Sequence, residues 1–93
     1  AVHYRGSAAG AAATCDAVRA AGGEAHPFQA DLGEPDAPAA LVDAAAAHFG
    51  GLDVLVNSAA VMERTPVAEV TTAQWDAMFA LNLRAPFFCA QAA

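Results

Sequence analysis

Three residues near the start of the chain have types and spacing that suit a phosphate group. Arg5, Gly6 and Ser7 follow a short stretch of strand-like residues and precede an alanine-rich segment that favours a helix. A guanidinium, a hydroxyl and the free N–H groups of a helix N-terminus together suit an anion. In the structural alternative, Arg5 is an exposed turn residue and Ser7 is only a helix cap.

A second candidate site lies where an apolar run, residues 54–56, ends in small side chains. The residues that follow the run are Asn57, Ser58, Ala59 and Ala60. A continuous apolar run bounded by turn residues suits a parallel strand that is buried on both faces. In open α/β sheets, ligands bind outside the carboxyl ends of such strands, and small residues let them come close. A plain strand-end turn is the alternative.

The elements that must position these residues alternate between strands and helices. In chain order, the expected strands and helices are at 1–4, 8–21, 25–30, 34–49, 54–56 and 72–93. Glycine pairs end the first two helices, a capping-box pattern at 71–74 opens the third, and Pro86 predicts a kink in it. This order predicts an α/β fold with a Rossmann-like, doubly wound parallel sheet.

The expected strands also bear on domain organisation. In the Rossmann order 3-2-1-4-5-6 they would be the second, third and fourth strands, and the first strand, which lies between the second and the fourth, is not among them. We therefore expect residues 1–93 to be an internal fragment of a single dinucleotide-binding domain.

Five short motifs in matching order resemble the short-chain dehydrogenase/reductase family. Leu52–Ala60 is similar to the family's L-D-x-L-V-N-N-A-G signature, with Ser58 in place of the second Asn and Ala60 in place of the Gly. The other four motifs are the turn at 5–7, the glycines at 22–23, the sequence Ala-Asp-Leu at 30–32, and Asn-Leu-x-x-Pro-Phe at 82–87. The resemblance covers essentially the whole chain.

The resemblance implies a nicotinamide dinucleotide cofactor. An NAD-binding domain usually ends its second strand with an acid that binds the ribose, but this chain has no acid before Asp16. Arg5 and Ser7 therefore imply NADP(H), with the 2′-phosphate between them. Asp31 and Leu32 are implied at the adenine.

The segment from Asn57 through Ser58 and Ala59 to Ala60 is implied beside the adenine ribose. The family uses the side chain of this Asn to tie neighbouring strands together.

Asn82 is the one catalytic candidate. In the family, an Asn at a helix kink holds a water through its carbonyl in the proton relay to a catalytic Lys, and Leu83, Pro86 and Phe87 match that context. A lone Asn in a helix is more often a tolerated polar residue. The glycine-rich turn and the catalytic Ser, Tyr and Lys of the family are not among these residues, so the fragment alone is expected to be inactive.

The parent protein is expected to be an NADP(H)-dependent oxidoreductase that passes a hydride between the nicotinamide and a carbonyl, an alcohol or a similar acceptor. Residues 3–8 and 82–88 look most like the pteridine-reductase branch, and ketones or 3-oxoacyl thioesters are the second substrate class. A non-catalytic NADP(H)-binding or scaffold protein of the same fold is one alternative. A nucleotide-free flavodoxin-like module is another, although Asp31 and Asp53 are not paired as it would require.

The composition of the chain argues against two classes of binding partner. A net charge of −6, with only four basic residues, all arginine, argues against binding to nucleic acid or to an anionic membrane surface. No apolar run has the length of a membrane span. Cys15 and Cys89 are far apart and predict free thiols in a reducing compartment, so we expect a cytoplasmic protein.

The three histidines lie on different elements, and no metal site is expected. Trp75, Met78 and Phe79 predict core packing or a subunit interface. The resemblance implies a homodimer or homotetramer joined through the helix at 72–93, which commonly forms the oligomer contact in the family.

Overall fold

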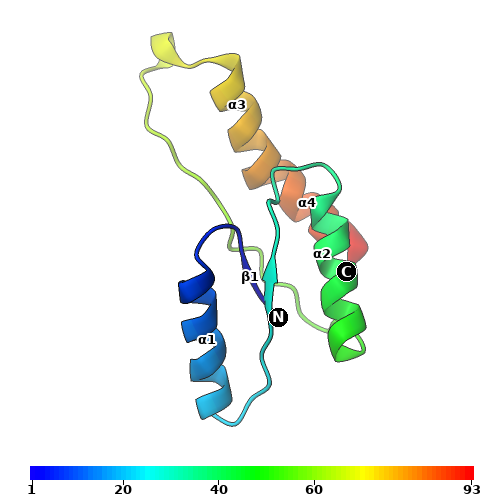
Figure 1. Ribbon diagram of the computed structural model, residues 1–93. Helices are drawn as coiled ribbons and strands as arrows, with labels where there is room; N and C mark the ends of the chain where they lie inside the picture. Colours follow the sequence, from blue (N-terminus) through cyan, green and yellow to red (C-terminus); the bar gives the residue numbers. More distant parts are fainter. The chain divides into compact units, whose positions relative to one another are not determined.

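The computed structural model describes all 93 residues and divides them into two compact units, residues 1–31 and residues 32–93. The first unit holds a strand, a helix and a second strand, and the second unit holds the remaining helices (Figure 1). None of the helices combines the length and the apolar character that crossing a bilayer requires.

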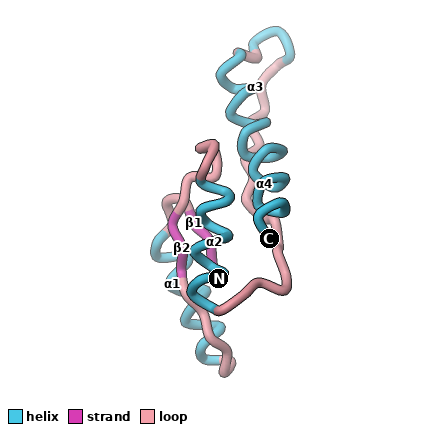
Figure 2. The backbone as a smooth tube through the Cα atoms, turned by 90° about the vertical axis from the view of Figure 1, so that its right-hand side faces the viewer, coloured by secondary structure: helices cyan, strands magenta, loops and turns pink.

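The first unit is a strand–helix–strand unit with a parallel sheet. Strand β1 (Val2–Tyr4) pairs with β2 (Pro27–Gln29) in parallel, with His3 opposite Phe28, and the two strands lie side by side in Figure 2. The ladder continues beyond β2, because the Ala30 N–H donates to the Tyr4 carbonyl at 3.1 Å. Both strands were predicted, although β2 is shorter than the expected 25–30.

Helix α1 (Ala8–Ala20) connects the two strands and contacts both. Its C-terminus is a Schellman motif: Gly22 has a φ of +88° and its N–H donates to Arg19, while the Gly23 N–H donates to Val18. Ala11 and Cys15 are the buried residues of the helix. The predicted helix and its glycine stop are therefore confirmed.

The second unit is built on helices α2 (Ala37–Phe49) and α4 (Ala85–Ala92), which contact each other closely. Pro38 of α2 and Ala85 and Cys89 of α4 are buried in the seam, together with Val42 and Ala45 of α2. The Cys89 thiol approaches the Pro38 carbonyl at 4.0 Å. Small residues on α4 let the two helices approach, which is how an alanine-rich chain obtains a core.

The predicted helix at 72–93 is present but is interrupted before its proline. Helix α3 (Thr72–Phe79) passes into a π-helical segment, η2 (Ala80–Arg84), and then into α4. Pro86 has no N–H to donate to the Asn82 carbonyl four residues earlier, so the regular bond pattern fails there. The Ala85 N–H instead donates to Ala80, five residues back. The irregularity therefore lies N-terminal to Pro86 and spans a full turn.

The predicted strand at 54–56 is wrong for this chain. Residues 51–66 have no regular secondary structure, and Val54 and Val56 are 74% and 79% exposed. A strand requires a hydrogen-bonded neighbour. The only strands are β1 and β2, which pair with each other. The apolar run is therefore present without the sheet that would bury it.

Candidate functional site

The N-terminus of α1 has the features that a phosphate group requires. Ser7 occupies the N-cap position, but its side chain makes no capping hydrogen bond. Its ψ is 70°, whereas Thr71, which does cap α3, has the same φ of −92° and a ψ of 156°. The first turn of α1 contains no acid, and Arg5 is exposed immediately before it. The hydroxyl and the helix N–H groups therefore remain available to an anion.

One hydrogen bond and one glycine also shape this end of the first unit. The Gln29 side chain donates to the Arg5 carbonyl at 3.1 Å, which fixes the backbone as it leaves β1. A Cβ placed on Gly10 would lie 2.7 Å from the Ser7 Oγ, so glycine at this position leaves room for the hydroxyl. Gly10 was not predicted as a site residue, and its spacing of three from Ser7 is the signal that could have found it.

Asp31 and Leu32 follow β2 after one intervening residue, Ala30. Asp31 is exposed, whereas Leu32 is only 7% exposed. The resemblance implies that Leu32 packs on the adenine ring. Such a contact would use the small part of its side chain that remains accessible.

The segment at 57–60 has no regular secondary structure and is largely accessible. Asn57, Ser58 and Ala60 are exposed, and Ala59 is half-buried. Glycines are the only residues with a positive φ, so Ala60 occupies the position of the family's glycine in a backbone conformation that any residue can adopt. The strand-tying role expected of Asn57 has no counterpart within this chain, because residues 51–66 pair with no strand.

Asn82 is brought next to this segment. Its Oδ1 accepts from the Val61 N–H at 2.9 Å, and its Nδ2 donates to the Val61 carbonyl at 2.7 Å. Val61 follows Ala60 directly, so the catalytic candidate and the end of the 57–60 segment meet in the second unit. The assignment of the amide's O and N follows from this pairing.

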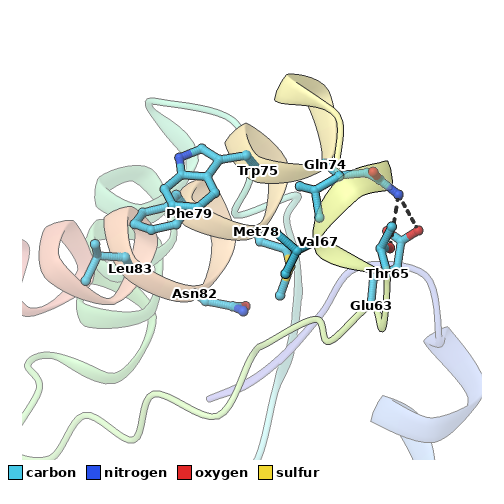
Figure 3. Close-up of a pocket in the computed structure, with 10 residues that line it drawn as sticks. Glu63, Thr65, Val67, Gln74, Trp75, Met78, Phe79, Asn82 and Leu83 are labelled. Carbon is cyan, nitrogen blue, oxygen red and sulfur yellow. Dashed lines mark hydrogen bonds between the residues drawn. The ribbon is translucent and has the colours of Figure 1, made fainter.

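The loop after Val61 is held by Gln74 of α3. Its Nε2 donates to the Glu63 carboxylate at 2.8 Å and contacts the Thr65 hydroxyl at 3.4 Å (Figure 3). Its Oε1 accepts from the Thr71 N–H, which completes the predicted capping box. The Glu63 carboxylate, although exposed, is therefore part of this network.

Loop and helix enclose an apolar groove of about 750 Å³. We call it the α3 groove. Its lining residues are Glu63, Thr65, Val67, Val70, Gln74, Trp75, Met78, Phe79, Asn82 and Leu83. Gln74, Glu63 and Thr65 gather at one end of it, and Asn82 lies apart from them (Figure 3). Aromatic side chains form a wall, with Trp75 stacked on Phe79 at 4.4 Å between ring centroids.

Comparison with known proteins decides the family. The family model described as short chain dehydrogenase matches residues 1–93. The chain belongs to the short-chain dehydrogenase/reductase family. The pteridine-reductase branch that the motifs favoured is not shown by any of these comparisons.

Particular relatives agree with this membership. Versicolorin reductase stcU of Emericella nidulans is 37% identical over 92 residues, covering 99% of this chain and 35% of the relative. A short-chain dehydrogenase from Burkholderia cenocepacia, solved in complex with NADP, superimposes with a TM-score of 0.94 at 37% identity, over 98% of this chain and 37% of that one.

A blue fluorescent protein from a metagenomic library, solved with NADPH, gives a TM-score of 0.91 at 33% identity over 98% of this chain and 38% of that one. The chain thus spans about a third of the length of the relatives it matches.

Proposed function

We propose that this chain contributes part of the cofactor site, and one catalytic side chain, to an NADP(H)-dependent oxidoreductase. The observation that carries the proposal is the N-terminus of α1. There the Ser7 hydroxyl makes no capping hydrogen bond, the first turn contains no acid and Arg5 lies just before it, which together favour a 2′-phosphate. An NAD-specific site would be expected to carry an acid there. The relatives solved with NADP and NADPH support the same cofactor.

Each candidate residue then has a role toward the cofactor. Arg5 and Ser7 would bind the 2′-phosphate, and Asp31 would accept from the adenine amine. Backbone and small side chains at 57–60 would lie against the adenine ribose. When bound, NADP(H) supplies or accepts the hydride, and Asn82 would hold a water in the path of the accompanying proton.

Two functions of Asn82 have to be reconciled in this proposal. Both polar atoms of its side chain are already engaged with Val61. The Asn82 backbone carbonyl, however, has lost its regular partner because Pro86 has no N–H. This carbonyl is the group that we propose holds the water, while the side chain fixes the segment at 57–60.

The substrate is proposed at the level of chemical class. A carbonyl, or the corresponding alcohol, fits the reductase and dehydrogenase names of the relatives. Within that class, the motifs at 3–8 and 82–88 favour a dihydropteridine, with ketones and 3-oxoacyl thioesters second. Versicolorin belongs on the test panel because a relative is named for it.

The test is a turnover assay with the full-length protein. NADPH oxidation is followed with a dihydropteridine, a ketone, a 3-oxoacyl thioester and versicolorin, and each assay is repeated with NADH. Turnover that prefers NADPH supports the proposal. Tight NADPH binding without turnover on any of the four would favour the non-catalytic alternative, and a preference for NADH would contradict the assigned role of Arg5.

We also propose that the helix at 72–93 joins copies of this protein into a homodimer or homotetramer. Large apolar side chains recur at intervals of four along it and are 44–62% exposed; they are Trp75, Phe79, Leu83 and Phe87. Contiguous exposed apolar surface of this kind is typical of interfaces. Leu83→Glu should dissociate the full-length oligomer in sedimentation, whereas Ala77→Glu, on another face, should not. A monomeric wild type would refute the proposal.

A reducing compartment such as the cytoplasm is proposed from the thiols. Cys15 and Cys89 are both buried and neither forms a disulfide.

A further inference from the structure

We propose that Arg84 is a positioning residue for the adenine half of the cofactor, acting through the loop that contains Asp31, Leu32 and Gly33. The proposal rests on the NADP(H) function proposed above. Its starting point is one hydrogen bond between distant parts of the second unit: Arg84 Nη2 donates to the Gly33 carbonyl, 51 residues away. Gly33 comes directly after the two residues expected at the adenine.

The chemistry of this contact is unusual for a guanidinium. Arg84 is half-buried, its Nε is fully buried without a hydrogen-bond partner, and its one hydrogen bond is to a neutral carbonyl. A guanidinium removed from water without a carboxylate carries a desolvation cost that the contact recovers only in part. Stability alone would favour a neutral side chain here, which points to a role in holding the loop.

Both ends of the contact are anchored. Arg84 ends the η2 segment, and the next residue, Ala85, is buried where α4 packs on α2. On the other side, Leu32 is buried and α2 begins four residues after Gly33. A guanidinium on a fixed backbone therefore binds a carbonyl one residue beyond the buried Leu32 side chain, and this limits how far Leu32 can move.

The same η2 segment holds a second backbone. Asn82 pairs with Val61, and Arg84, two residues later, holds Gly33. Side chains from one π-helical turn thus fix the two loops that carry most of the candidate adenine and ribose contacts in the second unit. Misplacing such a loop by about 1 Å can weaken a site strongly without any direct contact being lost.

The test compares ligands that contain only one half of the cofactor. Binding of adenosine 2′,5′-bisphosphate, reduced nicotinamide mononucleotide and NADPH is measured by calorimetry or competition on the full-length protein. The variants are Arg84→Met, which removes the donors and keeps the aliphatic stem, and Arg84→Lys, which keeps the charge and one donor group. Arg64→Met removes the same charge from an exposed position and serves as the control.

We expect Arg84→Met to weaken the bisphosphate and NADPH by a similar factor, about 10- to 150-fold, the range of one charge-assisted hydrogen bond. The nicotinamide mononucleotide should bind unchanged, and Arg84→Lys should recover most of the affinity. Arg64→Met should match the wild type. If Arg84→Met does not fold, the neutral variant Arg84→Gln takes its place, and an affinity loss that spares the nicotinamide mononucleotide supports the proposal.

Unchanged bisphosphate affinity in both variants would overturn the inference and leave the NADP(H) function standing. Equal weakening of both halves would also overturn it, because Arg84 would then be a general stability residue. If the wild type binds neither the bisphosphate nor NADPH, the proposed function fails and this inference fails with it.

Discussion

The side-chain amide of Asn82 forms two hydrogen bonds with the backbone of Val61, at 2.9 Å to the N–H and 2.7 Å to the carbonyl. This is the pattern with which a neighbouring strand would satisfy a residue. An amide side chain accepts at its oxygen and donates from its nitrogen, whereas an ionised carboxylate accepts only. Asn82 therefore supplies Val61 with a strand-like partner in a segment that has no strand.

Replacing Asn82 should affect stability and turnover together. Asn82→Ala removes both bonds, and Asn82→Asp keeps the acceptor but places a carboxylate oxygen against the Val61 carbonyl. Either change should lower the free energy of unfolding by about 1–2 kcal/mol. If the proton relay passes the Asn82 segment, turnover should also fall by about 100-fold or more. Urea denaturation and steady-state kinetics on the full-length protein measure the two effects.

The affinity for NADPH is the control for Asn82. It should fall far less than turnover, because Asn82 affects the cofactor only through the 57–60 segment that its side chain holds. A loss of NADPH affinity as large as the loss of turnover would mean that Asn82 supports the site only by holding the loop.

Reversing the charge of Arg5 should weaken NADPH but not NADH. Arg5→Glu removes a charge-assisted contact to the 2′-phosphate, which is worth about 1–3 kcal/mol. Arg64→Glu makes the same charge change at another exposed position and should leave both affinities unchanged. Equal NADPH binding by Arg5→Glu would refute the assignment of the phosphate, and calorimetry with both nucleotides decides the matter.

Gly10→Ala should weaken the preference for NADPH over NADH without lowering the stability of the protein. Alanine favours a helix over glycine by about 0.5–1 kcal/mol, but its Cβ would meet the Ser7 Oγ at 2.7 Å and turn the hydroxyl aside. We expect unchanged or higher stability with a several-fold weaker preference for NADPH. Ser7→Ala should give the same shift, and the double variant should add nothing further. Additive shifts would show that the two residues act independently.

The capping box at α3 gives a prediction on stability alone. Thr71→Ala removes the hydroxyl that accepts from the Gln74 N–H at 3.2 Å and should cost about 1 kcal/mol. Thr72→Ala, one residue later on the exposed first turn, should be close to neutral. Gln74→Ala should cost more than Thr71→Ala, because it also frees Glu63 and Thr65. Chemical denaturation of the three variants ranks them.

Cys89 should make stability depend on alkaline pH. Burial raises the pKa of the Cys89 thiol above its ordinary value of 9.0. The unfolded chain therefore ionises first, so the contribution is fully present below the unfolded pKa and is lost as pH rises through the folded one. Denaturation at pH 7.5 and 9.5 should show a larger loss for the wild type than for Cys89→Ala. Parallel losses would contradict the shift.

The helices could be predicted because their ends are marked locally. Gly22 and Gly50 both adopt the positive φ that their positions after a helix predicted, and Thr71 and Gln74 form both bonds of the capping box. These features depend on residues within one or two turns, which a sequence displays directly.

What could not be predicted depends on distant partners. The run at 54–56 has the composition of a buried strand, but pairing requires a neighbour that composition does not reveal. The types of Arg5 and Ser7 indicated a phosphate site, yet the free hydroxyl depends on a backbone ψ of 70° at Ser7. The bonds from Asn82 to Val61 and from Arg84 to Gly33 span 21 and 51 residues and have no local signature.

The π-helical turn before Pro86 has one more consequence, which concerns the phase of the helix. A turn closed by an i→i+5 bond holds about one residue more than a regular α-helical turn. Every residue after Arg84 is therefore rotated relative to the sequence spacing by roughly one position, or about 100°. Deleting one residue from 80–84 would let the helix run regularly and keep Ala85 and Cys89 toward Pro38, whereas regular α-helical winding of the full-length segment would turn them away by about 100°. The buried face of α4 and the exposed face of α3 thus keep separate angular registers, with a single proline setting the offset between them.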